Sequence, residues 1–196
     1  MTTTFDVIVL GAGAMGSAAA YHLSRAGQRV LVLEQFEIDH QKGSSYGYSR
    51  IIRYAYDHPA YVKLAKAAYP AWAVLEEEAR ETLYTRTGGI DFGPSVDAGL
   101  RATVETLRTM NIPHEHVPVA EARERFPQFH FDDNMDVVYQ ADYGVLAASR
   151  CVRAHIRLAE AHGCAIRSNM PVRAITPGQS GVLYQGARLL GGGLIR

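Results

Sequence analysis

The glycine-rich motif GAGAMG at residues 11–16 constrains the fold of this chain more than any other feature, because of the segments that surround it. An apolar, β-branched run at residues 5–10 leads into it and predicts a strand buried on both faces, as in parallel sheets. An alanine-rich helical pattern follows and ends at Gly27, and a second apolar strand at residues 29–33 ends in Glu34. This order of strand, motif, helix, strand and acid predicts a βαβ unit.

The three glycines of the motif predict a dinucleotide site. Gly11 permits the tight turn out of the first strand, Gly13 lets a pyrophosphate approach the backbone, and Gly16 lets helix and sheet pack closely. The N-terminus of the helix offers N–H donors and partial positive charge to phosphates. Glu34 is placed to accept hydrogen bonds from a ribose diol, and its charge disfavours the 2′-phosphate of NADP. The alternative is a glycine-rich turn in another α/β fold, and the motif alone does not distinguish NAD from FAD.

Periodicity along the rest of the chain predicts further helices and strands. We expect helices at residues 61–78, 98–110, 119–126 and 150–162. Residues 83–93 are expected to form a strand or a hairpin, and further strands are expected at residues 114–117, 137–140 and 164–168. Pro70 is expected to kink or restart the first of these helices, and Ser149 to be the N-cap of the last. The late helix and strand indicate a return to the nucleotide-binding sheet, so the middle of the chain is expected to be an inserted domain.

The tail after Gly181 shows no legible apolar strand, and any strand there is expected to be weak. Its glycine triplet at residues 191–193 adds no side-chain packing and loses the most backbone entropy on folding. We therefore expect the last domain to be incomplete at the C-terminus.

Composition excludes several classes of partner. The 20 basic and 20 acidic side chains give a formal net charge of zero, which disfavours nucleic acid and anionic membranes as main partners. No apolar run approaches the roughly 18–20 residues of a membrane-spanning helix. Cys151 and Cys164 form neither a disulfide framework nor a metal pattern, and the eight histidines are scattered, so no metal site is expected. These features favour a globular protein of the reducing cytoplasm that acts on a small molecule.

A second informative segment, GSSYGYSRIIRYAY, occupies residues 43–56. Gly43, Ser44 and Ser45 supply donors where the chain leaves the second strand and could cross a cofactor. Arg50 and Arg53 suit bidentate pairing with a carboxylate and stay charged at any working pH. On chemistry alone, an equally good interpretation is a pair of surface arginines that flank two core isoleucines.

Together, DVIVLGAGAMGSAAAYHLSRAG and GSSYGYSRIIRYAY resemble the N-terminal half of the monomeric sarcosine oxidase and N-methyltryptophan oxidase family. These are FAD-dependent amine oxidases of the D-amino-acid oxidase superfamily. Further matching stretches are YVKLAKAAYPAW, TGGIDFGP, ERFPQF, YGVLAASRCVRAHIRLAEAHGC and MPVRAI. The resemblance runs from about residue 5 to residue 182, and its RIIR element is far more specific than the glycines.

This resemblance implies an α/β fold with a Rossmann-like, glutathione-reductase-like FAD-binding domain. That domain would consist of residues 1–82 and 146–196 and be incomplete at its C-terminus, with residues 83–145 as the first part of an inserted α+β substrate domain. The implied reaction oxidises a secondary amino acid, sarcosine or another N-methyl or cyclic amine, to an imine, and oxygen then gives hydrogen peroxide. The implied partners are the amino-acid substrate and oxygen.

The resemblance also assigns residues. Arg50 would lie beside the flavin ring, where its charge favours the reduced flavin, and Arg53 would bind the carboxylate of the substrate. The implied FAD contacts are Gly11, Ala12, Gly13, Met15, Gly16, Glu34, Gln35, Gly43, Ser44, Ser45, Arg50 and Val172.

The chain departs from the family at several points. Tyr46 takes a candidate catalytic position where sarcosine oxidases carry a histidine beside the flavin, and Tyr48 replaces a small acid. The chain stops before the regions where the family places an oxygen-activating lysine and the cysteine that can bind flavin covalently. Two alternatives follow, a truncated, non-catalytic FAD-binding remnant and, less favoured, an NAD-dependent dehydrogenase.

Overall fold

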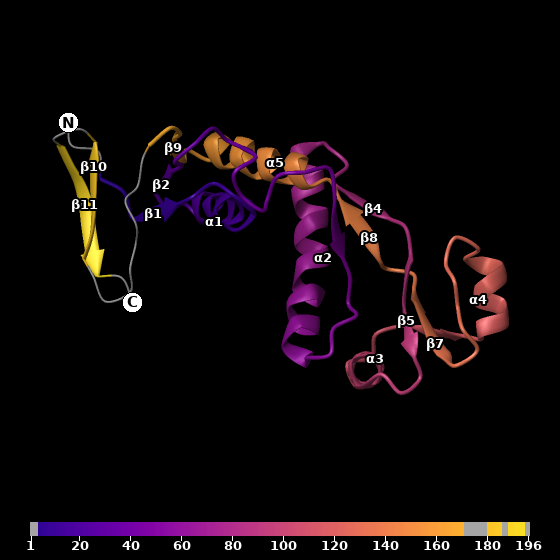
Figure 1. Ribbon diagram of the computed structural model, residues 1–196. Helices are drawn as coiled ribbons and strands as arrows, with labels where there is room; N and C mark the ends of the chain where they lie inside the picture. Colours follow the sequence, from indigo (N-terminus) through magenta and orange to yellow (C-terminus); the bar gives the residue numbers. More distant parts are fainter. Residues whose placement is uncertain (1–3, 171–179, 186–187, 195–196) are drawn as a thin grey trace. The chain divides into compact units, whose positions relative to one another are not determined.

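The computed structural model describes residues 4–170, 180–185 and 188–194 of the chain (Figure 1). These residues form two compact units. Unit 1 combines Met1–Tyr48 with Ala148–Arg196, and unit 2 is Ser49–Ala147. None of the helices in the described part of the chain combines the length and the apolar character that a membrane span requires.

Unit 1 contains the βαβ arrangement that the glycine motif predicts. Strands β1 (Val7–Leu10), β2 (Val30–Leu33) and β9 (Ala165–Arg167) form a parallel sheet in the order β1-β2-β9. Every residue of β2 is buried, as expected of the central strand of such a sheet.

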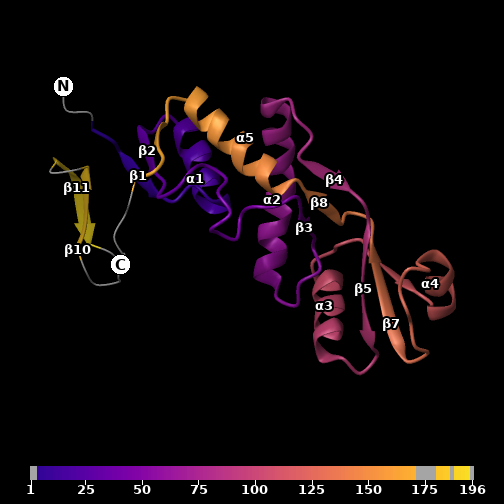
Figure 2. The same cartoon turned by 45° about the horizontal axis from the view of Figure 1, so that its top comes forward.

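Two helices of unit 1 pack against each other beside this sheet, α1 (Ala14–Arg25) and α5 (Ala148–Ala161) (Figure 2). Helix α1 connects β1 to β2, and α5 precedes β9. The prediction that Ser149 caps α5 is wrong, because the helix already begins at Ala148. The Ser149 hydroxyl instead accepts a hydrogen bond from the Gly47 N–H at 3.1 Å.

The end of the chain forms an antiparallel hairpin of β10 (Ser180–Gln185) and β11 (Arg188–Leu194). The glycine triplet, which was expected to weaken any strand here, lies within β11. The glycines at 191–193 pair with residues 181–183, since ladder hydrogen bonds use only backbone groups.

Unit 2 contains two antiparallel sheets and three helices (Figure 2). One sheet has the order β3-β8-β4, formed by Arg50–Ile52, Gly144–Leu146 and Tyr84–Arg86. The other has the order β5-β7-β6, formed by Gly89–Pro94, Met135–Gln140 and Glu115–Val117. The helices are α2 (Pro59–Ala79), α3 (Ala98–Thr109) and α4 (Val119–Arg125).

Strand β7 separates the two hydrophobic clusters of unit 2. Val138 packs with Val62, Leu107 and Ile112, whereas Val137 packs with Val117, Ala122 and Phe131. Consecutive side chains of a strand point to opposite faces, so these two valines serve different clusters.

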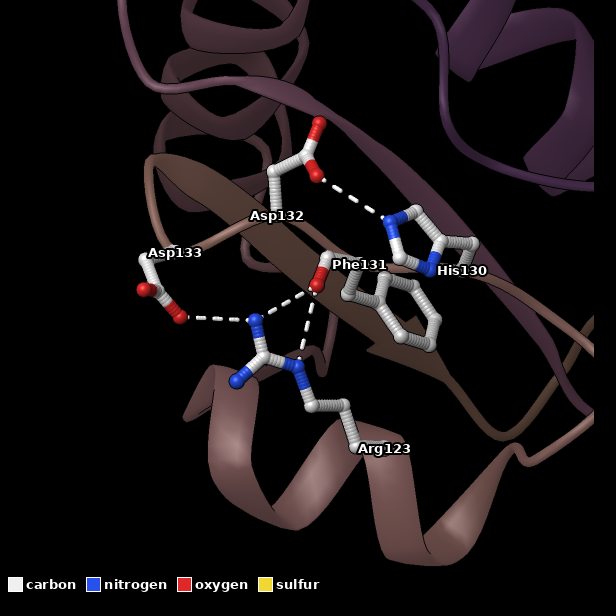
Figure 3. A network of polar contacts seen from close by, with 5 residues as sticks. All are labelled: Arg123, His130, Phe131, Asp132 and Asp133. Atoms are coloured by element: carbon white, nitrogen blue, oxygen red, sulfur yellow. Dashed lines mark hydrogen bonds and ion pairs between the residues drawn. The ribbon is translucent and has the colours of Figure 1, made fainter.

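Helix α4 is tied to the segment that follows it by Arg123 (Figure 3). The Arg123 guanidinium donates two hydrogen bonds to the Phe131 carbonyl, at 2.9 and 2.6 Å, and pairs with Asp133 at 2.7 Å. His130 and Asp132 form a second, exposed contact at 3.1 Å. These hydrogen bonds fix the backbone of Phe131, whose buried ring belongs to the second cluster.

Two further features of unit 2 differ from the sequence expectation. Unit 2 begins at Ser49 rather than at residue 83, because β3 pairs with β8 and Val62 of α2 belongs to a core cluster of this unit. Of the two outcomes expected of Pro70, a kink or a restart of the helix, the restart is wrong, because α2 runs without interruption through Ala79.

Candidate functional site

The glycine loop of unit 1 has the close contacts that require glycine. Gly11 follows β1 with φ of +90°, a conformation that disfavours side chains. A Cβ on Gly16 would overlap the Gly11 carbonyl oxygen, and a Cβ on Gly13 would lie 2.9 Å from Ser45 Oγ. Gly16 therefore allows helix α1 to start directly against the end of β1, as the motif predicts.

Glu34 is held against this loop rather than facing open solvent. The residue is 5% exposed, and its Oε2 accepts a hydrogen bond from the Ala12 N–H at 2.7 Å. Its Oε1 accepts from the Phe36 N–H at 3.0 Å and lies 3.3 Å from Nε2 of His40. Because Nδ1 of His40 accepts from the Lys42 N–H, Nε2 is the nitrogen that carries a hydrogen toward Glu34. A carboxylate has about four lone-pair positions, so this arrangement leaves one for a ribose hydroxyl.

Ser45 brings the segment after β2 to the N-terminus of α1. Its hydroxyl accepts a hydrogen bond from the Ala14 N–H at 2.9 Å, although the two residues are far apart in sequence. Ser45 thus satisfies one of the N–H groups that the first turn of a helix leaves without an intrahelical partner.

A small cavity of about 50 Å³ lies between the glycine loop and this segment. Its lining residues are Ala12, Gly13, Asp39, His40, Gly43, Ser45, Tyr46 and Val152. Five of the residues predicted from the sequence to serve the cofactor or catalysis, Ala12, Gly13, Gly43, Ser45 and Tyr46, therefore meet at one place in unit 1. The hollow lies beside the glycine loop and the first turn of α1, where backbone N–H groups can serve a ligand.

Asp39 is a residue of this cavity that the sequence analysis missed. Its side chain is 1% exposed, and its Oδ2 lies 2.8 Å from the guanidinium of Arg153 on α5. A carboxylate this buried needs compensation for its charge, and the ion pair with Arg153 supplies it. Neither residue stands in a recognisable motif, so the sequence carried no signal for this pair.

Other residues of unit 1 that were predicted to belong to the site are more exposed to solvent. Met15 is 84% exposed, and Gln35, Gly43 and Ser44 are also exposed. The Tyr46 hydroxyl accepts a hydrogen bond from Gln41 at 3.3 Å. The catalytic role of Tyr46 stays a prediction. Val172, which was predicted to contact the cofactor, lies outside the described residues.

The two arginines of the RIIR element have different surroundings in unit 2. Arg50, in β3, is exposed and donates to the Ser49 carbonyl at 2.7 Å. The two isoleucines differ as well, since Ile52 is buried and Ile51 is 69% exposed. Arg53 follows β3 and is half-buried, so the interpretation of both arginines as ordinary surface residues does not describe Arg53.

Arg53 belongs to a polar cluster with Asp91 and Tyr143. Its Nη1 donates to Asp91 Oδ1 at 3.0 Å and to the Tyr143 hydroxyl at 3.2 Å, and this hydroxyl donates to the other Asp91 oxygen. The guanidinium also lies over the ring of Tyr56, 5.3 Å from its centroid. Burial alone would lower the pKa of Arg53, but the hydrogen bond with Tyr143 and the charge of Asp91 outweigh it and raise the pKa. The guanidinium is therefore a permanent cation with a defined orientation.

Comparison with known proteins gives a family match over most of the chain. The family model "DAO: FAD dependent oxidoreductase" matches residues 6–190. Monomeric sarcosine oxidase of Bacillus sp. (strain NS-129) is 36% identical over 174 residues, 88% of this chain and 45% of the relative. N-methyl-L-tryptophan oxidase of Yersinia pestis (strain Pestoides F) is 35% identical over 179 residues, 91% of this chain and 48% of the relative. The chain spans about half the length of the curated relatives it matches.

Solved structures agree on the fold. NikD, an unusual amino acid oxidase essential for nikkomycin biosynthesis, matches with a TM-score of 0.75 at 24% identity, over 91% of this chain and 44% of the other. L-proline dehydrogenase from P. horikoshii matches with a TM-score of 0.74 at 20% identity, over 90% of this chain and 47% of the other.

Proposed function

The chain belongs to the DAO family of FAD-dependent oxidoreductases, and we propose that it takes part in the oxidation of a secondary amino acid to an imine. The proposed substrate is sarcosine or another N-methyl or cyclic amine, with oxygen as the electron acceptor and hydrogen peroxide as the product. Family membership, with the resemblance stated from RIIR and the glycine motif, supports this assignment.

The observation that carries the proposal is that the Arg53 guanidinium is half-buried, charged and held by fixed partners. A half-buried, permanently charged guanidinium with one set of fixed partners is suited to a carboxylate ligand. We assign Arg53 to the carboxylate of the substrate, which fixes the position of the amine-bearing carbon. Orientation of this kind converts binding energy into catalysis without a reacting protein group.

The residues of unit 1 would hold the cofactor. The glycine loop would receive the diphosphate and Glu34 one ribose hydroxyl, while Ser45 keeps the following segment in place. When bound, FAD supplies the hydride-accepting chemistry that amino-acid side chains lack. We assign Arg50 to the flavin ring, where a fixed positive charge stabilises developing negative charge. The catalytic role of Tyr46 and the adenine contact of Val172 remain part of this proposal.

We also propose a cytoplasmic location and no nucleic-acid or membrane partner. Both cysteines are free and buried, which agrees with a reducing compartment. The balanced charge of the chain agrees with a small-molecule partner.

The test is a spectroscopic titration of the purified chain with FAD. The proposal predicts a yellow protein whose flavin absorbance bleaches when sarcosine is added without oxygen. A protein that binds FAD and keeps its colour with every secondary amine would support the non-catalytic alternative instead. Formation of NADH during turnover would support the dehydrogenase.

A further inference from the structure

Asp91 and Tyr143 have no role in the function proposed above, yet they determine how Arg53 is held. We propose that both are positioning residues, which turn the Nε–Nη2 edge of the Arg53 guanidinium toward a carboxylate-bearing substrate. This inference rests on the proposed role of Arg53 and adds the origin of its selectivity for amino acids over simple amines.

The pairing of strands brings the three residues together. Ile52 of β3 pairs with Gly144 of β8, so the next residue of one strand, Arg53, lies opposite the preceding residue of the other, Tyr143. Asp91 comes from the middle of β5, which is fixed by its pairing with β7. The cluster is therefore supported by regular backbone structure rather than by a loop.

The hydrogen bonds divide the guanidinium into an occupied end and an open edge. A guanidinium has five N–H groups, two on each Nη and one on Nε. The bonds from Nη1 to Asp91 and Tyr143 use both hydrogens of that nitrogen. Among the residues that the structure describes, neither Nε nor Nη2 of Arg53 has a hydrogen-bond partner. The Nε and Nη2 hydrogens form a parallel pair that matches the two oxygens of a carboxylate.

Tyr143 locks this arrangement because its hydroxyl bonds to both other members. The hydroxyl accepts from Arg53 and donates to Asp91, which closes a ring of three hydrogen bonds. Tyr143 is buried, and burial followed by the neighbouring Asp91 carboxylate raises its pKa, so the hydroxyl keeps its proton at neutral pH. The Asp91 side chain is 19% exposed and partly offsets the charge of Arg53. With charge partly compensated, selectivity for a carboxylate depends on the direction of the open edge.

The experiment compares two ligands that differ only in the group that Arg53 would bind. Sarcosine carries a carboxylate, and sarcosinamide replaces it with a neutral amide. Dissociation constants for both are obtained from the ligand concentration that half-saturates the rate of flavin bleaching without oxygen, measured on the purified, FAD-loaded chain, and the Nε–H resonance of Arg53 is followed by NMR. The variants are Tyr143→Phe and Asp91→Asn, with Tyr84→Phe and Asp136→Asn as matched controls that do not contact Arg53.

We expect wild type to prefer sarcosine, with a shift of the Arg53 Nε–H resonance on binding. Tyr143→Phe and Asp91→Asn should each weaken sarcosine binding by about tenfold, the effect of one hydrogen bond, and leave sarcosinamide unchanged. The controls should keep the wild-type ratio. A variant that unfolds would lose binding of both ligands alike. If Asp91→Asn unfolds, the outcome is decided by Tyr143→Phe, which removes only a single oxygen atom.

Two other results separate the inference from its premise. If both variants keep the wild-type ratio while Arg53→Met loses it, the positioning role is wrong and the proposed role of Arg53 stands. If Arg53→Met also keeps the ratio, or wild type shows no preference for the carboxylate, the substrate role of Arg53 fails and the positioning role fails with it.

Discussion

The carboxylate of Glu34 accepts a hydrogen bond from the backbone N–H of Ala12 at 2.7 Å, joining the end of β2 to the glycine loop. Sequence reasoning assigned this acid to a ribose diol. The structure gives it three protein donors, from Ala12, Phe36 and His40. Glu34 therefore helps to shape the loop itself, and any contribution to ribose binding uses the remaining lone pair.

Replacing Glu34 with Gln should destabilise the chain by about 2 kcal/mol, because the amide NH₂ group would face a backbone N–H donor in a buried site. Urea unfolding followed by circular dichroism measures this loss. Glu37→Gln is the matched control, since Glu37 is exposed and close in sequence. Equal stability of the two variants would show that the contact with Ala12 contributes nothing to the fold.

The packing of α1 against α5 should make the stability of the chain depend on pH through His155. Burial, followed by the charge of His22, lowers the pKa of His155 from 6.5 to about 4. The unfolded state then binds the proton more tightly, so stability is fully present above pH 6.5 and is lost as pH falls toward 4. The loss should reach up to about 3 kcal/mol, from roughly 1.36 kcal/mol for each pKa unit.

His155→Gln should flatten this dependence when the free energy of unfolding is measured from pH 7.5 to 4. Exposed His130 is the control position, and His130→Gln should retain the wild-type slope. A wild-type slope in His155→Gln would assign the pH dependence to other groups.

Gln140, at the end of β7, should be a site where an apolar residue stabilises the chain. The residue is 1% exposed, and within the described part of the chain neither atom of its amide has a hydrogen-bond partner. Gln140→Met removes two buried polar groups at similar volume and should add about 1 kcal/mol to the free energy of unfolding. Exposed Gln128→Met should be neutral in the same measurement. A loss of stability at position 140 would mean that the amide has a binding partner after all.

Local sequence rules predicted the parts of the fold that local physics controls. The glycine motif between two apolar runs was sufficient to predict the βαβ unit. In the structure β2 pairs with β1 and is buried at every position. Strand β3 was not predicted, because Arg50–Ile52 lies in a segment of glycine, serine and tyrosine and is a strand only through its pairing with residues 144–146. A three-residue strand of this kind has no periodicity to detect.

The same distinction between local patterns and long-range strand pairing applies to the site. Arg53 was predicted from its chemistry and from the family resemblance. Its partners Asp91 and Tyr143 were missed, because only the register of β3 against β8 and the pairing of β5 with β7 reveal that they meet it. His40 and Asp39 were missed for a similar reason, since their contacts with Glu34 and Arg153 depend on the path of the chain after β2.

The measurement that tests the central claim most directly is the dissociation constant of sarcosine for Arg53→Met. Met keeps much of the side-chain volume and removes the charge and every N–H donor. Arg86→Met is the control, since Arg86 is an exposed arginine of the same unit that pairs with Asp142.

Truncating one member of a partly buried charge pair costs about 2–5 kcal/mol, so the dissociation constant should rise on the order of 100-fold in Arg53→Met, with FAD still bound. Arg86→Met should bind sarcosine like wild type. A dissociation constant that is unchanged in Arg53→Met would contradict the assignment of this residue to the carboxylate of an amino-acid substrate.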